Sequence, residues 1–174
     1  MRYLNSVEDE LESRDWRQHL DAGHAAYANG RYPAAEVEFV AALKEAERFG
    51  DADVRLAKTL NNLAVVYQLQ GKYAFACDSY LRSLAVKLRA HGDEHPDVAV
   101  EFHNLAVLNS ARRRFVDAED YFKKAMAMRE KLLGIGHSDY ASTLAEYASL
   151  MRRTGRTVDA DAMEEHFEAA RKRL

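Results

Sequence analysis

The blocks Gly30-Arg31-Tyr32, Gly71-Lys72-Tyr73, Arg113-Arg114-Phe115 and Gly155-Arg156-Thr157 recur at intervals of 41, 42 and 42 residues. A small residue stands three positions after the end of each block, at Ala35, Ala76, Ala118 and Ala160. A large aromatic stands seven positions after the first three, at Phe39, Tyr80 and Phe122, while the last copy has Glu164. A period in this range is typical of an array of one small repeated unit, so the sequence predicts a repeat protein.

Composition favours helix almost throughout the 174 residues. The chain has only two prolines and eight glycines, hydrophobic residues make up 48%, and Ala, Leu, Glu and Arg are abundant. These last residue types lose least on entering a helix.

Charge and cysteine content narrow the class of protein. The net charge is −3, which disfavours nucleic acid as the main ligand. No apolar run is long enough to cross a bilayer, and the start of the chain is acidic without a signal-peptide apolar region. The single cysteine, Cys77, excludes an internal disulfide. We therefore expect a cytoplasmic protein that binds neither membrane nor nucleic acid.

Each copy reads as helix, turn, helix. Apolar residues at helical spacing, such as Leu56, Leu60 and Leu63, predict one apolar face per helix. The predicted helices are 14–29, 33–49, 54–70, 73–91, 97–112, 115–133, 139–154 and 157–173, with a short extra helix near 6–12. Ser13, Asp97 and Ser138 or Asp139 are the expected N-caps, and Pro33 and Pro96 fall at helix starts.

The turn glycine suits a left-handed helix end, and Arg113 replaces it in the third copy. Either that turn takes another form or Arg113 is strained.

The repeated aromatics are expected in the core: Tyr32, Phe39, Tyr73, Tyr80, Phe115 and Phe122. The last helix has an apolar stripe (Ala160, Met163, Phe167, Ala170, Leu174) opposite a charged face, which predicts a terminal cap and a true chain end.

This pattern resembles the tetratricopeptide repeat, and its length of about 42 residues resembles the kinesin light chain type. The linkers 92–99 and 134–141 both read Gly-x-x-His-x-Asp-x-Ala, and Leu60-Asn61-Asn62-Leu63-Ala64 also looks like that type. The resemblance implies an all-α fold, a right-handed α-solenoid of about four helix-turn-helix repeats. We expect residues 1–13 to form an extension or short helix and residues 14–174 to form the repeat domain, with repeats at about 14–53, 54–96, 97–138 and 139–174.

The resemblance further implies that the first helix of each pair lines a concave groove that binds a protein or peptide segment. The candidate groove residues are Arg17, His24, Tyr27, Lys58, Asn61, Asn62, Val65, Gln68, His103, Asn104, Val107 and Arg152. Other positions placed there are Leu20, Asp21, Ala28, Leu69, Val100, Ser110, Ala111, Ser142, Ala145, Glu146, Ser149 and Arg153.

Asn62 and Asn104 lie 42 residues apart, and an amide that both donates and accepts suits a peptide backbone. Alternatively, these asparagines cap or bridge the neighbouring repeat. Lys58, Arg152 and Arg153 either favour an acidic partner or a free carboxyl terminus, or are solvated surface.

Other residue types give weaker signals. His91 and His95 are four apart, but Gly92 and Pro96 place them in a linker, so a structural role is favoured and no metal site is predicted. Cys77 has no activating base, and no phosphate loop or catalytic triad occurs. We expect no enzyme and no cofactor, although loss of turnover on changing His24 or His103 would indicate one.

The sequence thus predicts an interaction scaffold or adaptor. The alternative function is structural, in which the chain forms homo-oligomers through repeat edges. Leu4, Val7, Leu11 and Trp16 either form an exposed apolar patch for that purpose or act as a local cap on the first repeat.

Overall fold

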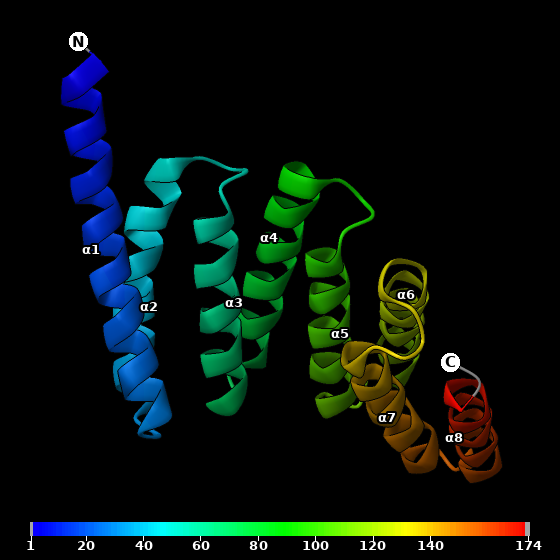
Figure 1. Ribbon diagram of the computed structural model, residues 1–174. Coiled ribbons are helices and arrows are strands. Elements are labelled where there is room, and N and C mark those ends of the chain that lie inside the picture. Colours follow the sequence, from blue (N-terminus) through cyan, green and yellow to red (C-terminus); the bar gives the residue numbers. More distant parts are fainter. Residues whose placement is uncertain (1, 173–174) are drawn as a thin grey trace. The chain divides into compact units, whose positions relative to one another are not determined.

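The computed structural model describes the backbone of residues 2–172 and the side chains of residues 14–172. Every regular element in this part of the chain is helical (Figure 1). The elements are α1 (Arg2–Ala28), α2 (Tyr32–Ala46), the 3-10 turn η1 (Glu47–Phe49), α3 (Val54–Leu69), α4 (Tyr73–His91), α5 (Pro96–Ala111), α6 (Phe115–Leu133), α7 (Ser138–Arg153) and α8 (Thr157–Arg171). The all-α class and the series of helix-turn-helix pairs are confirmed.

One predicted boundary is wrong. α1 runs without a break from Arg2 to Ala28, so residues 6–12 are not a separate helix and no helix starts after Ser13. Residues 6–16 contain neither glycine nor proline, so nothing in the local sequence ends a helix there. Leu174, expected on the apolar stripe of α8, lies outside the described residues.

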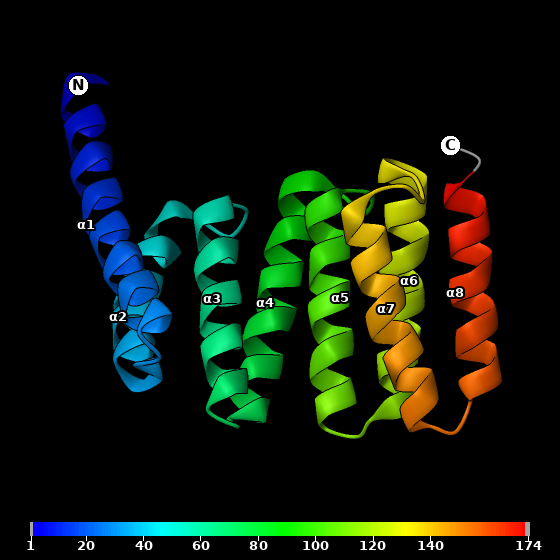
Figure 2. The ribbon, with the colours of Figure 1, turned by 60° about the horizontal axis from the view of Figure 1, so that its bottom comes forward.

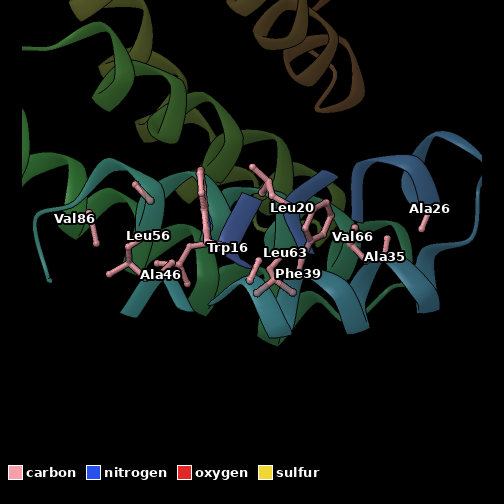
Figure 3. Packing of buried hydrophobic residues seen from close by; sticks show 13 residues of the cluster. Trp16, Leu20, Ala26, Ala35, Phe39, Ala46, Leu56, Leu63, Val66 and Val86 are labelled. Atoms are coloured by element: carbon pink, nitrogen blue, oxygen red, sulfur yellow. The ribbon is translucent and has the colours of Figure 1, made fainter. Parts of the chain in front are cut away.

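The chain divides into two compact units, Met1–Ala90 and His91–Leu174. In the first unit α1 packs along α2, and α2 packs against α3 (Figure 2). Its core includes Trp16 and Leu20 of α1, Phe39 of α2 and Leu63 of α3 (Figure 3). Ser83 of α4 donates a hydrogen bond to the Ala57 carbonyl of α3 at 3.0 Å.

Trp16 belongs to this core and not to an exposed patch. Its side chain is buried, its indole N–H donates to Thr59 Oγ1 at 2.9 Å, and its ring meets Phe49 edge-on at a centroid distance of 6.5 Å. The described part of the apolar patch is therefore a local cap on the first repeat. The side chains of Leu4, Val7 and Leu11 lie outside the described residues.

In the second unit α5 packs on α6, α6 on α7, and α7 on α8. Its core contains Ala106, Ala118, Phe122, Tyr147 and Leu150. The rings of Phe122 and Tyr147 stack at a centroid distance of 5.7 Å, which joins α6 to α7.

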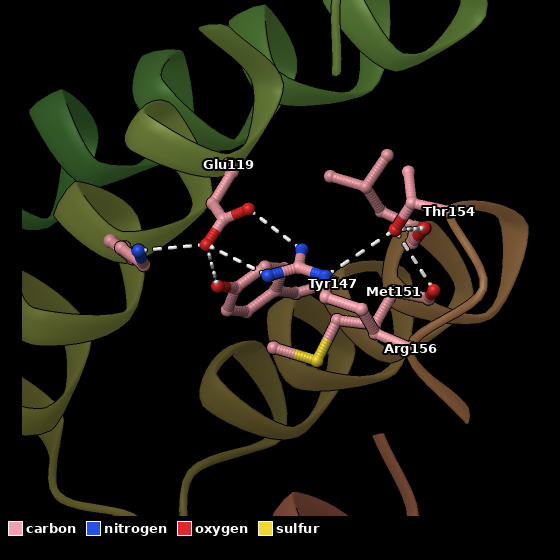
Figure 4. Close-up of polar contacts among 7 residues, drawn as sticks. Glu119, Tyr147, Met151, Thr154 and Arg156 are labelled. Atoms are coloured by element: carbon pink, nitrogen blue, oxygen red, sulfur yellow. Dashed lines mark hydrogen bonds and ion pairs between the residues drawn. The ribbon is translucent and has the colours of Figure 1, made fainter. Parts of the chain in front are cut away.

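A carboxylate reinforces this junction (Figure 4). Glu119 of α6 accepts from Tyr147 Oη at 2.8 Å, from Arg156 Nη2 at 2.7 Å, and from Lys123 Nζ at 2.7 Å. The Arg156 guanidinium, with Lys123, holds the pKa of Glu119 down to about 2, and burial beside this carboxylate raises the pKa of Tyr147. Glu36 has the corresponding position in the first unit, where it accepts from Gln70 Nε2 at 2.8 Å and from Lys72 Nζ at 2.6 Å.

The turn at Arg113 keeps the form of the glycine turns. Arg113 has a φ of +61°, close to +69° at Gly30, +73° at Gly71 and +82° at Gly155. The backbone bonds also correspond, since Arg113 N donates to Ser110 O at 3.1 Å as Gly71 N donates to Gln68 O at 3.0 Å. Arg113 therefore adopts a left-handed backbone conformation, which is unfavourable for a residue that has a Cβ atom.

Histidines, and not the predicted aspartates or Ser138, cap two of the first helices. His95 Nδ1 accepts from Asp97 N at 3.1 Å, and His137 Nδ1 accepts from Asp139 N at the same distance. Asp97 and Asp139 instead lie in the first turn of their helices, where a negative charge interacts favourably with the positive end of the helix dipole.

The predicted core aromatics are buried or half-buried except Tyr73, which is 38% exposed. Tyr32 lies against Tyr27 at a centroid distance of 6.0 Å, whereas the residue at the position of Tyr27 in the second repeat is Gln68. Tyr73 therefore has no equivalent ring from the preceding helix to cover it, and its assignment to the core is wrong.

Candidate functional site

A small cavity lies on the first unit, between residues of α1, α2 and α3. Its volume is about 180 Å³, and its lining consists of His24, Tyr27, Phe39, Asn62 and Val65. Four of these five are residues that the sequence assigned to the groove. Phe39 was assigned to the core, and it contributes the fully buried part of the lining.

Polar and aromatic contacts fix the walls of this cavity. Asn62 Nδ2 of α3 donates to His24 Nε2 of α1 at 3.0 Å. The His24 ring stands edge-on to Phe39 at a centroid distance of 5.4 Å. An asparagine amide has two N–H groups and a carbonyl oxygen, and the bond to His24 uses one N–H.

The remaining groove residues predicted on α1 and α3 do not line this cavity. Arg17 and Lys58 are exposed, while Asn61 and Gln68 are half-buried. Leu20 is buried in the core, so its assignment to a ligand surface is wrong. Leu20 belongs to the same buried cluster as Phe39, which a repeat position alone does not show.

In the second unit, His103 is part of a polar cluster beneath the α5 surface. His103 Nδ1 lies 3.3 Å from Thr143 Oγ1, and its ring is edge-on to Phe122 at 6.1 Å. Arg129 donates to Thr143 Oγ1 and, at 2.6 Å, to the Asp139 carbonyl oxygen. Burial and the Arg129 charge lower the pKa of His103 to about 4, so this imidazole is neutral near pH 7. Asn104 and Val107 are half-buried on the same helix.

The two arginines of α7 that were assigned to the groove are bonded to other side chains of the protein. Arg152 donates to Asp161 at 2.7 Å and to Glu164 at 2.6 Å, both on α8. Arg153 donates to Ser110 Oγ at 2.6 Å and lies over the Phe115 ring at 5.4 Å. Ser110 is itself buried, so it does not face a ligand as predicted. These bonds direct the positive charge of Arg152 to α8 and that of Arg153 to α5 and α6.

The chemistry of the cavity suits binding. Its walls are aromatic and aliphatic apart from one amide and one imidazole, which are bonded to each other. Sites for drug-sized ligands and cofactors are typically about 300–1,000 Å³, so this cavity is too small for them and suits a single side chain. Within the described residues, no helix is both long and apolar enough to span a bilayer.

Comparison with protein families identifies the repeat. The family model described as "Tetratricopeptide repeat" matches residues 55–131 and 102–173. The chain belongs to the tetratricopeptide repeat family. Proteins built from these repeats are generally non-enzymatic scaffolds with protein partners, and the fold supports that general role here. A search of curated proteins found no match.

Solved structures of similar fold include proteins described as a putative kinesin light chain. BtubC (BKLC) from P. vanneervenii is 22% identical, with a TM-score of 0.82 over 98% of this chain and 73% of that one. A putative kinesin light chain with nearly identical TPR-like repeats, from Podospora anserina, is 20% identical, with a TM-score of 0.75 over 88% and 74%. A variant of that protein is 19% identical, with a TM-score of 0.77 over 88% of this chain and 73% of that one. At these identities the likeness concerns the fold.

Proposed function

We propose that this tetratricopeptide repeat chain is an adaptor that binds a segment of a partner protein on the exposed face of its first helices. The observation that carries the proposal is the convergence of His24, Tyr27, Asn62 and Val65 on one cavity. These residues come from two helices, and the resemblance to the repeat family had assigned all four to the groove before the cavity was known.

The chemistry of the lining suggests how a segment is held. An apolar side chain of the partner enters the cavity against Phe39 and Val65, since these surfaces gain most from exclusion of water. The Asn62 amide bonds the partner's backbone next to that side chain, because its oxygen and second N–H match a peptide group. Asn104 of α5, at the same repeat position in the second unit, offers the same donor and acceptor groups.

The lining also favours protein over other partners. The residues of the cavity carry no fixed positive charge, whereas binding to nucleic acid depends on lysines and arginines that neutralise phosphates. Arg152, one of three basic residues considered for an acidic ligand, is already paired with two carboxylates. We therefore propose that apolar side chains, more than acidic ones, determine which segment binds.

Selection from a displayed library of random peptides tests this function. We expect the wild-type chain to enrich peptides that share an aliphatic residue, and Val65→Glu to lose them because a carboxylate would enter the apolar cavity. Asn62→Ala should weaken the binding of the same peptides. Val37→Glu is the matched control, since Val37 is 66% exposed on α2 and lies away from the cavity lining.

If Val65→Glu and Val37→Glu both retain the same peptides, the cavity is not the binding site. Light scattering measures the oligomeric state of the wild-type chain and so tests the alternative function, in which the exposed helix faces bind another copy of the chain. A monomer at high concentration that still enriches peptides supports the adaptor, whereas an oligomer that enriches none supports self-assembly.

A further inference from the structure

Three potential metal ligands meet where α4 ends and α5 begins. His91 is the last residue of α4, His95 is the N-cap of α5, and Asp97 lies in its first turn. One ligand atom from each lies within 4.8 Å of the other two. The Asp97 Oδ2 atom is 3.6 Å from His91 Nε2 and 3.7 Å from His95 Nδ1.

These separations are close to those of a zinc site. With metal–ligand bonds of about 2.0–2.2 Å, neighbouring ligand atoms in a tetrahedral site are about 3.3–3.6 Å apart. The two histidine–aspartate separations are at or just beyond the upper end of that range. Small movements of the exposed Asp97 side chain and the two half-buried histidine rings would therefore bring the three atoms to coordinating distance.

An independent observation concerns His91. Its Nε2 atom is buried and has no hydrogen-bond partner among the described residues. A buried polar atom without a hydrogen bond loses its hydration without the compensation that a hydrogen bond would give. A bound cation would satisfy this nitrogen, because neutral imidazole coordinates metal through its lone pair.

The second linker, residues 134–141 before α7, shows which residues are needed to cap a helix without a metal site. His137 caps α7 as His95 caps α5, and Asp139 corresponds to Asp97. The residue at the position of His91, however, is Leu133. The His-x-Asp pair is therefore explained by the helix start, whereas His91 is not needed for it.

We propose that His91, His95 and Asp97 bind a divalent transition-metal ion such as Zn²⁺. Two imidazole nitrogens and one carboxylate oxygen are donors that zinc accepts, and water would complete the tetrahedron. The sequence predicted a structural role for both histidines, since it did not show Asp97 turned back toward them.

Coordination requires two local changes. The rings of His91 and His95 are stacked at a centroid distance of 4.0 Å and an interplanar angle of 13°, so they must tilt for their lone pairs to converge. If His95 coordinates through Nδ1, it also gives up the bond from Asp97 N. The ion then joins the end of α4 to the first turn of α5 and stabilises the folded linker by mass action.

Titration of the tag-free chain with Co²⁺, followed by displacement with Zn²⁺, tests the proposal. We expect one Co²⁺ per chain, with the visible absorption of a tetrahedral site that Zn²⁺ abolishes. His91→Leu, which installs the residue of the second linker, should weaken binding at least about tenfold, since losing a residue that merely orients a ligand already costs 10–100-fold. His137→Asn is the matched control and should bind as the wild type does.

Equal affinity of the wild type and His91→Leu would overturn the site, as would equal loss in His137→Asn or no binding by the wild type at millimolar metal. Circular dichroism without metal checks that His91→Leu is folded. If it is not, Asp97→Asn decides in its place, because this change keeps the side-chain size and removes the carboxylate. Asp97→Asn that binds as tightly as the wild type would also overturn the proposal.

Discussion

Gly23 of α1 lies so close to the ring of Phe39 that a Cβ on Gly23 would stand 2.4 Å from Phe39 Cε1. Phe39 is only 1% exposed and contributes the buried part of the cavity lining. The lack of a side chain at one residue of α1 therefore determines both how closely α1 approaches α2 and how the cavity beside His24 is formed.

Gly23→Ala should destabilise the protein. Alanine favours helix over glycine by about 1 kcal/mol, but overpacking a tight core costs about 1–3 kcal/mol. Because the buried Phe39 ring cannot move aside freely, we expect a net loss of about 1 kcal/mol in the free energy of unfolding, measured with urea. The control is Gly23→Ala combined with Phe39→Leu, whose cost should be less than the sum of the single changes. Strict additivity would show that the ring is not what opposes the methyl group.

Arg113→Gly should stabilise the protein. A left-handed conformation costs a residue with a side chain about 1–2 kcal/mol, and glycine avoids that cost. The matched control is Gly155→Ala, at a φ of +82° with no atom within 4 Å of the added Cβ, which should destabilise by a similar amount. Urea unfolding at one pH compares both variants with the wild type, and an unchanged midpoint for Arg113→Gly would show that its turn is not strained.

The helices could be predicted from the sequence because each copy repeats the same signals. A turn glycine or a proline flanks at least one end of each of the eight predicted helices. Seven of the eight match the observed bounds at both ends within a few residues. Ser13 failed as a helix start because a capping residue type is permissive and does not break a helix that continues through it. The caps at His95 and His137 were missed since histidine is not among the usual capping residues.

The resemblance to the repeat family also predicted part of the site. The repeat positions that it assigns to the groove include His24 and Asn62 on neighbouring first helices, and the structure joins these two residues by a hydrogen bond. They could not predict the partners of Arg152, because a repeat position gives the direction of the Cα–Cβ bond and not where a long side chain ends. The meeting of His91 with Asp97 depends on the chain reversal at Gly92, where φ is +80°, which spacing along a helix does not describe.

Glu119→Gln should destabilise the chain at neutral pH. The pKa of Glu119 is lowered to about 2, first by the bond from Arg156 and then by Lys123, against a usual value near 4.5. The folded state therefore gains stability from the ionised group above about pH 4.5 and loses it as the pH falls toward 2. Since the site is partly solvated, we expect a cost of about 1–2 kcal/mol at pH 7 that shrinks in acid.

Urea unfolding at pH 7 and at pH 3 measures that difference. NMR titration of the Glu119 carboxyl adds a ranking, because Arg156→Met should raise its pKa more than Lys123→Met does. An equal cost of Glu119→Gln at both pH values would show that the carboxylate's charge is not responsible.

His103 should make the second unit sensitive to mild acid. Burial and the Arg129 guanidinium lower its folded pKa to about 4, whereas an unfolded histidine titrates near 6.5. Between these values the unfolded chain binds a proton that the folded chain does not, so stability falls as the pH drops from about 6.5 to 4. The slope from this one group is at most about 1.4 kcal/mol per pH unit. His103→Asn should flatten the pH dependence of urea unfolding in that window, and NMR titration of the His103 ring measures the pKa directly. A folded pKa near 6.5, or an unchanged slope in His103→Asn, would contradict a half-buried imidazole that stays neutral in the folded chain.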